Sequence, residues 1–147
     1  MEVLFHNKDP KGGLKEDGNR IFFTLSQPVV IQPGEIKKVP TGATIKPPVG
    51  TVILVSTPES LYSRALEIFP AVLILDYTTP EKVLEIPIRN GGRNQINLKE
   101  GEVIATAHLV LVEDWNLQAF SPKTAEENRA SKTQPQRKNS DITFEIR

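Results

Sequence analysis

The stretch VPTGATIKPPVGTVILV, residues 39–55, decides the fold class. It combines a Pro-Thr-Gly corner, a double proline, a glycine and then five β-forming residues in a row. Two adjacent prolines exclude a helix, because proline lacks an N–H donor and its ring clashes with the preceding turn. The run Thr-Val-Ile-Leu-Val favours a pleated strand instead. The stretch therefore predicts a strand, a tight corner and another strand.

Short β-type runs repeat this pattern on both sides of the opening stretch. Glycine and proline turns bound them, and they span residues 2–5, 20–25, 28–32, 43–46, 51–56, 71–76, 82–88, 93–98 and 102–112. Many short strands with regular turn signals are typical of an all-β sandwich, jelly roll or barrel. The NGGRN sequence at 90–94 is predicted to close a hairpin. We therefore expect an all-β fold with little helix.

One segment fits either a short helix or a β-loop. TPESLYSRALEI, residues 57–68, offers Thr57 as a helix cap and Pro58 at the first helical position. In a helix, Leu61, Ala65 and Ile68 would share one face.

Composition bounds the class of protein. The chain has 147 residues, enough for one domain with its own core. Lys plus Arg equals Asp plus Glu at 18 each, so no overall charge favours nucleic acid or membrane as a partner. The absence of cysteine excludes disulfides, thiolate catalysis and cysteine-bound metal, and suits a reducing compartment. With no signal-like N-terminus and no apolar run long enough for a bilayer, we expect a cytoplasmic protein.

The sequence divides into three segments. Residues 1–114 hold the β-type runs, residues 115–141 have the polar composition of a linker, and residues 142–147 alternate apolar and polar side chains again. Ile142, Phe144 and Ile146 would share one face of a strand. A tether of about 27 residues reaches tens of ångströms as a loose coil. We therefore predict that 142–146 forms an arm that pairs with a sheet edge, more readily on a neighbouring subunit than on its own.

Four segments in order resemble motifs of the dUTP pyrophosphatase (dUTPase) family. VPTGATIKPPVGT resembles the family's Pro-Thr-Gly corner, strand and Pro-x-Gly turn. The others are DGNRIFFTL (17–25), AVLILDY (71–77) and INLKEGEVIATAHLVLV (96–112), and the likeness covers about residues 1–113. The resemblance implies a jelly-roll-like β-domain, assembly as a homotrimer, and a C-terminal arm that reaches over another subunit.

The phosphate-binding turn of the family is altered in this chain. Hydrolysis of dUTP needs donors for the triphosphate, a carboxylate that orients water, and Mg²⁺ to neutralise the phosphates. Where the family has Arg-Ser-Gly, this chain has Pro58, Glu59 and Ser60. Glu59 puts a negative charge where a polyphosphate would lie, at a cost of about 1–4 kcal/mol. Arg64, six residues beyond Pro58, is the nearby cation that could take the missing arginine's place.

The other motifs diverge as well. Arg20 replaces an aspartate of the first motif, and Thr106 replaces the glutamine of the last core motif. Asp76 is retained at the position that in the family holds water and contacts the deoxyribose, but it also fits a turn residue at the end of a strand. Tyr77 lies beside it, whereas the family's sugar-stacking tyrosine lies a few residues on. DITFEIR lacks the glycines of the family's closing motif.

These departures predict a catalytically silent relative of dUTPase: a trimeric scaffold for binding or assembly, of possible phage or viral origin, without a cofactor. Its protein partner is not indicated, and the altered motifs speak against nucleotide binding. One alternative is a divergent pyrophosphatase of dUTP or another deoxynucleotide that uses Asp76 with Mg²⁺. Another is a structural trimer associated with a virion or capsid. His108, which alternates with Ala107 and Leu109, is predicted to be a partly buried strand residue and not a ligand.

Overall fold

The opening stretch folds as predicted in the computed structural model, which describes residues 2–18, 20–112 and 116–122. β5 (Ile36–Pro40), β6 (Ala43–Lys46) and β7 (Thr51–Ser56) are separated by two tight corners. At the first corner Thr41 is fully buried, and its N–H and Oγ1 both donate to the Leu84 carbonyl, at 3.1 and 2.8 Å. Gly42 follows with a φ of +74°, a left-handed conformation that glycine adopts without strain.

Most of the predicted strands are present. The remaining elements are β1 (Leu4–Asn7), β2 (Gly13–Asp17), β3 (Arg20–Thr24), β4 (Val29–Ile31), α1 (Glu59–Tyr62), β8 (Leu66–Ile68), β9 (Val72–Leu75), β10 (Glu85–Asn90), β11 (Ile96–Leu98) and β12 (Val103–Leu111). They all belong to one unit, residues 1–112. The second unit, residues 113–147, contains no helix or strand in its described part, 116–122. The all-β prediction is confirmed.

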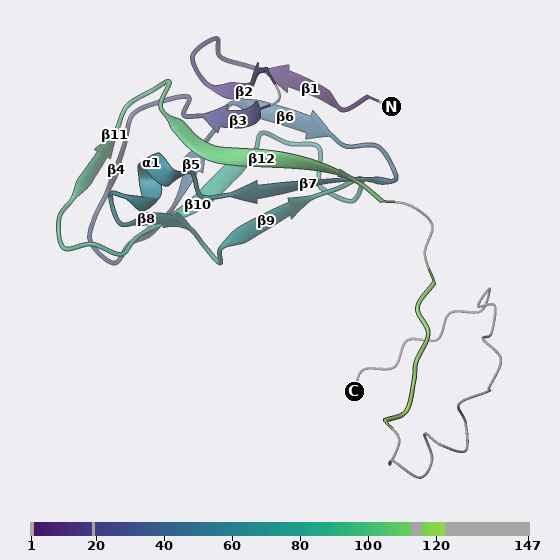
Figure 1. The fold of residues 1–147 in the computed structure, drawn as a ribbon. Coiled ribbons are helices and arrows are strands. Elements are labelled where there is room, and N and C mark those ends of the chain that lie inside the picture. The colour runs from purple at the N-terminus through teal and green to yellow at the C-terminus, as the bar shows by residue number, and fades with distance from the viewer. Residues whose placement is uncertain (1, 19, 113–115, 123–147) are drawn as a thin grey trace. The chain divides into compact units, whose positions relative to one another are not determined.

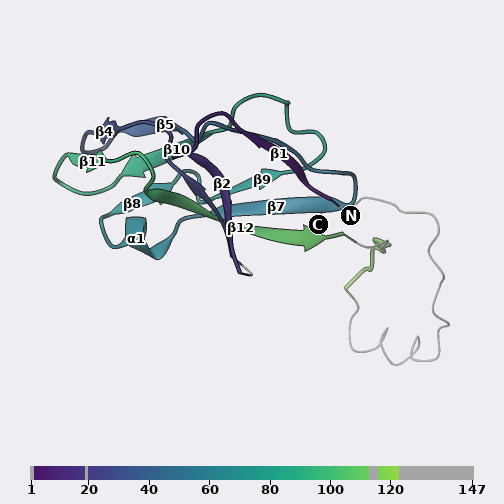
Figure 2. The ribbon, with the colours of Figure 1, turned by 90° about the horizontal axis from the view of Figure 1, so that it is seen from above.

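Every strand pair in the described residues is antiparallel. The largest sheet has the order β2-β3-β12-β7-β9, a second has the order β5-β10-β8, and the pairs β1-β6 and β11-β4 complete the domain. β7 and β12 lie along one side of the domain and β4, β5 and β10 along the other (Figure 2). In Figure 1, β12 runs the length of the large sheet. The domain is therefore built as two β-layers with β12 at the centre of one.

The core lies between these layers. β7 shows the alternation of a half-buried strand: Thr51, Ile53 and Val55 are buried, and the residues between them are partly exposed. The largest fully buried side chains come from both layers and include Phe23, Leu25, Ile31, Leu66, Ile68, Ile86, Ile88, Leu98 and Ile104.

The segment 57–68 was predicted to form either a short helix or a β-loop, and neither form extends over its whole length. α1 has only four residues, and Pro58 is its N-cap, not its first helical residue. Thr57 does not cap the helix, because its Oγ1 accepts the N–H of Ile68 at 2.9 Å. Ala65 has a φ of +60°, which ends the helical path, and Ile68 belongs to β8, which pairs with β10. Pairing with β10 thus prevents the predicted helical face of residues 61, 65 and 68.

The prediction of a hairpin at NGGRN is wrong. β10 ends at Asn90 and pairs with β5 and β8, whereas β11 pairs with β4. The turn therefore passes the chain from one sheet to another. The reason is Asn90, which is fully buried and uses its side chain to hold this crossing in place.

Asn90 is the most connected polar residue of the core. Its Nδ2 donates to the carbonyls of Ile31, at 3.0 Å, and Asn94, at 2.8 Å. Its Oδ1 accepts the N–H of Gly92 at 2.9 Å, and its own N–H donates to the Glu35 carbonyl at 2.9 Å. One amide side chain thus joins β4, β10 and the 91–94 turn.

In the described residues, no helix is long and apolar enough to cross a membrane. The predicted arm, 142–146, and most of the predicted linker lie outside the described residues.

Replacing Asn90 by alanine should lower the free energy of unfolding by about 2–3 kcal/mol, because the buried Ile31 carbonyl and the part-buried Asn94 carbonyl and Gly92 N–H all lose their partner. Urea denaturation of the variant and the parent chain measures the difference. Asn97→Ala, at an exposed position of β11, is the matched control and should change stability by less than about 0.5 kcal/mol. Equal effects of the two substitutions would contradict the structural role of Asn90.

Candidate functional site

Five of the predicted motif positions line one groove on the large sheet. Arg20, Pro58, Glu59, Ser60 and Thr106 come together there, although the sequence separates them by up to 86 positions (106 − 20). The groove has a volume of about 470 Å³, within the range of about 300–1,000 Å³ that small-molecule sites usually have. The remaining lining residues are Asp17, Ile21, Phe22, Val103, Ala107 and His108.

Strand order explains why these residues meet. β12 lies between β3 and β7, so Thr106 is opposite Phe22 on one side and Ser56 on the other. The Ser56 Oγ and Thr106 Oγ1 atoms lie 2.9 Å apart and form a hydrogen bond. The chain leaves β7 at Ser56 and enters α1 directly, which places Pro58 and Glu59 above the same end of the sheet. The groove therefore follows from the topology of β3, β12 and β7.

The charges in the groove are unsuited to a polyphosphate. Asp17 and Glu59 contribute two carboxylates and Arg20 contributes one guanidinium, so these three charges sum to −1. Glu59 lies in the first turn of α1, where a carboxylate stabilises the positive end of the helix. The position of Glu59 in the helix therefore accounts for this carboxylate without a phosphate ligand.

Arg64 is not in position to replace the missing arginine. Its Nη1 lies 3.1 Å from Glu102 Oε1, and its Nη2 donates to the Asn97 carbonyl at 3.1 Å. The ion pair is half-exposed, so its contribution to stability is small, but the geometry is fixed by two partners. Arg64 does not line the groove.

Asp76 and Tyr77 lie apart from the groove, on the loop after β9. The Asp76 Oδ1 atom accepts both the hydroxyl of Thr78, at 2.5 Å, and its N–H, at 2.9 Å. The Thr78 hydroxyl, and then its N–H, lower the pKa of Asp76 below its ordinary value of 3.8. Tyr77 is exposed. Asp76 thus acts here as the ionised first residue of a turn.

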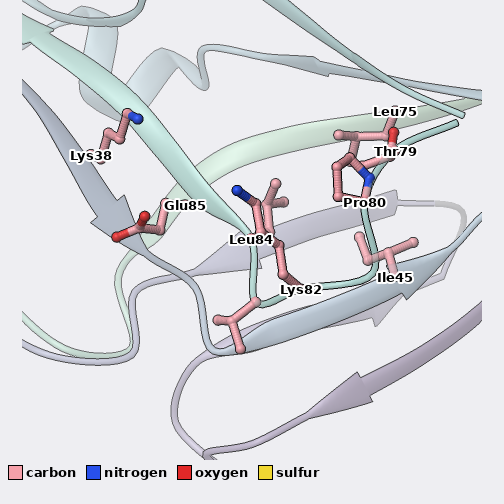
Figure 3. Close-up of a pocket in the computed structure, with 9 residues that line it drawn as sticks. Lys38, Ile45, Leu75, Thr79, Pro80, Lys82, Leu84 and Glu85 are labelled. Carbon is pink, nitrogen blue, oxygen red and sulfur yellow. The ribbon is translucent and has the colours of Figure 1, made fainter.

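The loop that carries Asp76 closes over a smaller hollow. This second cavity has a volume of about 120 Å³, below the usual range for small-molecule sites. Figure 3 shows Lys38 and Glu85 on one side and Leu75, Thr79 and Pro80 on the other. Asp76 does not line this cavity either. The cavity is too small to hold a nucleotide.

His108 differs from its prediction, because it is exposed and not partly buried. The predicted alternation of β12 is correct, but His108 lies on the outward face of the strand. His108 lies opposite Leu54, whereas Leu109 lies opposite the buried Ile53. Sequence reasoning did not single out Asp17 and Phe22 as groove residues, although both lie within the DGNRIFFTL segment. The register of β2, β3 and β12 places them in the groove.

The described residues contain no candidate metal site formed by side chains alone. Among them, no three His, Asp or Glu side chains converge in a way that could hold a metal ion. The alternative function placed Mg²⁺ at Asp76, but that carboxylate is engaged by Thr78 and lies outside the groove. Asp76 is thus a single carboxylate and not a preformed metal site among the described residues.

Comparison with solved structures identifies the fold. The dUTPase of Staphylococcus bacteriophage 80alpha is 15% identical, with a TM-score of 0.69 over 84% of this chain and 99% of that chain. The EIAV dUTPase is 17% identical, with a TM-score of 0.67 over 84% and 99%. The dUTPase of Streptococcus mutans is 18% identical, with a TM-score of 0.66 over 76% and 98%. No protein-family model and no curated protein matches the sequence.

The chain therefore has the dUTPase-like jelly-roll fold, and the resemblance seen in the sequence motifs is confirmed at the level of the fold. Identities of 15–18% do not transfer an activity, because one fold supports different functions through different site residues.

The hydrogen bonds of Asp76 give a prediction about pH. Thr78→Ala removes the hydroxyl donor and should raise the pKa of Asp76 toward its ordinary value, measured by NMR titration of the carboxyl carbon. Since the folded-state pKa is depressed, this hydroxyl stabilises the fold above the unfolded pKa, and the stabilisation is lost as the pH falls through the folded pKa.

Thr79→Ala is the matched control, because the Thr79 hydroxyl accepts the N–H of Asp76 and does not contact its carboxylate. A pKa of Asp76 that stays the same in Thr78→Ala would contradict this assignment.

Proposed function

We propose that this protein is a catalytically silent member of the dUTPase fold that acts as a homotrimeric scaffold for binding or assembly. The observation that supports this most is the composition of the groove. Five of the seven positions that resemble the catalytic motifs come together on one surface, but the residues there provide no cationic turn, and their charges sum to −1. The scaffold of the site is kept while its phosphate-handling groups are replaced.

Electrostatics supports loss of the reaction. A polyphosphate in the groove would meet the carboxylates of Asp17 and Glu59, each repelling it by about 1 kcal/mol or more at contact. Pro58 has neither a side-chain cation nor a backbone N–H, so the turn lacks both the guanidinium and the main-chain donor of an arginine turn. Loss of one preorganised donor lowers a hydrolysis rate by about 10²–10³. Several such losses together favour a role without catalysis.

The structural relatives offer a precedent for a role beyond hydrolysis. The Staphylococcus bacteriophage 80alpha dUTPase is one of the phage dUTPases that control transfer of virulence genes. A dUTPase fold can thus serve as a regulator in a phage. This supports a regulatory scaffold of phage or viral origin ahead of a structural virion trimer for this chain, with a protein as its partner.

The proposed trimer has an available surface on the large sheet. The outward face of β9 and β12 exposes Val72, Ile74 and Val110, and Ile74 is 63% exposed. β7 adds Val52 and Leu54 between them, because Leu54 lies opposite Ile74 and Val52 opposite Val110. These side chains form an apolar sheet face, which we call the β9–β12 face. A contiguous exposed apolar face is typical of a protein–protein contact.

A divergent pyrophosphatase is the second candidate. One observation favours it: the Asp76 carboxylate is ionised and lies at the surface, where a nucleotide delivered with Mg²⁺ could reach it. In that case Asp76 would act away from the groove of its own subunit.

A hydrolysis assay separates the two candidates. We expect no pyrophosphate release from dUTP with Mg²⁺ above the rate without protein, and no rise in melting temperature with dUTP, since a ligand that binds the native state must stabilise it. Pyrophosphate release by the parent chain that disappears in Asp76→Asn would overturn the scaffold proposal and establish the second candidate.

Restoring the turn provides a matched gain-of-function variant. Pro58→Arg with Glu59→Ser and Ser60→Gly rebuilds the family's Arg-Ser-Gly turn and removes one acid from the groove. It should raise the melting temperature in the presence of dUTP, because the removed repulsion and the new donor both favour the triphosphate.

Ile74→Asp tests the proposed trimer, because a charge in the centre of a buried apolar contact leaves it desolvated and unpaired. We expect the parent chain to sediment as a trimer and Ile74→Asp to shift toward a monomer. Val30→Asp, at an exposed position of β4 outside the β9–β12 face, is the control and should leave the trimer intact. A monomeric parent chain at micromolar concentration would refute the assembly while leaving catalytic silence to the hydrolysis assay.

A further inference from the structure

Asn90 and Gly91 form an asparagine-glycine pair at the end of β10. In an unfolded chain such a pair deamidates readily, because glycine has no side chain to hinder attack of its backbone nitrogen on the asparagine Cγ atom. The Gly91 nitrogen loses its proton, the N–Cγ bond forms and the Cγ–Nδ2 bond breaks, so that ammonia leaves and a cyclic imide remains. Water then opens the imide to aspartate or isoaspartate. The net reaction exchanges ammonia for water and needs no oxidant, reductant or enzyme.

The fold engages each group that would take part in this reaction. The attacking nitrogen keeps its proton in a hydrogen bond, since the Gly91 N–H donates to the Ala65 carbonyl at 2.8 Å. The leaving nitrogen, Asn90 Nδ2, donates to the carbonyls of Ile31 and Asn94 at 3.0 and 2.8 Å. The Oδ1 atom accepts a third hydrogen bond from the turn. Turning the amide toward the Gly91 nitrogen therefore breaks all three bonds of the side chain.

Burial and strand pairing also keep water from the Asn90 side chain. Asn90 is 0% exposed. Its N–H donates to the Glu35 carbonyl at 2.9 Å, its own carbonyl accepts the N–H of Gly34 at 2.7 Å, and it pairs with Leu66 of β8. β10 lies between β5 and β8, and a central strand opens only at a free energy close to that of global unfolding. The reaction is thus limited to molecules in which this sheet has opened.

The glycine at position 91 is not required by the fold. Gly91 has no left-handed φ, unlike Gly42. A Cβ atom at position 91 would lie 3.5 Å from the Ala65 carbonyl oxygen, which is an ordinary contact. Gly92 is tighter, because a Cβ atom there would lie 3.3 Å from both Ala65 Cβ and Asn90 Oδ1. Alanine fits at position 91, yet the chain has the residue that leaves the attack on Asn90 unhindered.

The products of deamidation cannot replace the Asn90 amide. An aspartate side chain has no N–H for the carbonyls of Ile31 and Asn94, and its charge would be buried against both oxygens. Isoaspartate lengthens the backbone at a residue that pairs with Leu66. A chain that has deamidated here therefore does not return to the native fold.

We infer that Asn90-Gly91 is a deamidation site that the fold closes and that unfolding opens. Time spent unfolded is converted into an irreversible chemical change, so the pair limits how often a molecule can unfold and still recover. The reactants are the chain and water alone. The inference is independent of the proposed function, because it concerns the turn after β10 and holds whatever the groove binds.

Peptide mapping by mass spectrometry measures the reaction in the full chain, kept at one mildly alkaline pH either folded or in urea. Aspartate and isoaspartate at position 90 should accumulate in urea, and about 10²-fold or more slowly in the folded chain, because open states are rare there. The fraction that refolds after removal of urea, followed by circular dichroism, should fall in parallel. Equal rates in the two conditions would overturn the proposal.

Gly91→Ala is the matched control, because it leaves Asn90 and its hydrogen bonds in place. The variant should melt with the parent chain, since the added Cβ makes an ordinary contact. In urea its Asn90 should deamidate roughly tenfold or more slowly, because the added methyl group hinders the attack, and its ability to refold should persist. Loss of refolding at the parent's rate would place the damage elsewhere in the chain and would refute the inference.

Asn90→Asp supplies one product of the reaction directly. It should have a lower urea midpoint than Asn90→Ala, because it adds a buried charge to the loss of the same donors. An Asn90→Asp chain that refolds to the stability of the parent would show that the change is harmless, and would overturn the irreversible step even if deamidation in urea is observed.

Discussion

The buried amide of Asn90 is the constraint on which the placement of the candidate site depends. It fixes the turn at 91–94 through the N–H of Gly92, and within that turn the N–H of Gly91 donates to the Ala65 carbonyl at 2.8 Å. Ala65 adopts a φ of +60°, which directs the chain from α1 into β8. Since α1 holds Glu59 and Ser60 over the groove, a side chain in the second layer sets the position of the groove's wall.

The β-rich class and most strands could be predicted from local sequence, because runs such as TVILVS combine β-branched residues with proline and glycine at both ends. β2 (GLKED) and β5 (IKKVP) could not, since their charged residues have weak strand preference and pairing with β3 and β10 determines their conformation. The helix predicted within 57–68 was wrong because strand pairing also determines the conformation there. Its helical pattern is outweighed by the pairing of β8 with β10.

The candidate site could be predicted as a set of positions but not as a surface. Motif likeness singled out Arg20, Pro58 and Thr106, and the strand order β3-β12-β7 brings them together. Asp17 and His108 lie within the segments that carry the likeness, but only the strand register shows that they line the groove. It also gave Asp76 a place among the motif residues, whereas the structure shows a turn carboxylate bonded to Thr78. A residue can therefore match a motif position without lying in the groove.

The outer face of the large sheet thus has two regions of different polarity. Near β2, β3 and the start of β12 it is polar and weakly acidic, and across β7, β9 and the end of β12 it is apolar. A groove evolved for a triphosphate would need positive charge beside its hydroxyls, but here carboxylates take that place while the apolar half remains large. An exposed apolar face is typical of a protein–protein contact, and it supports the proposed assembly role.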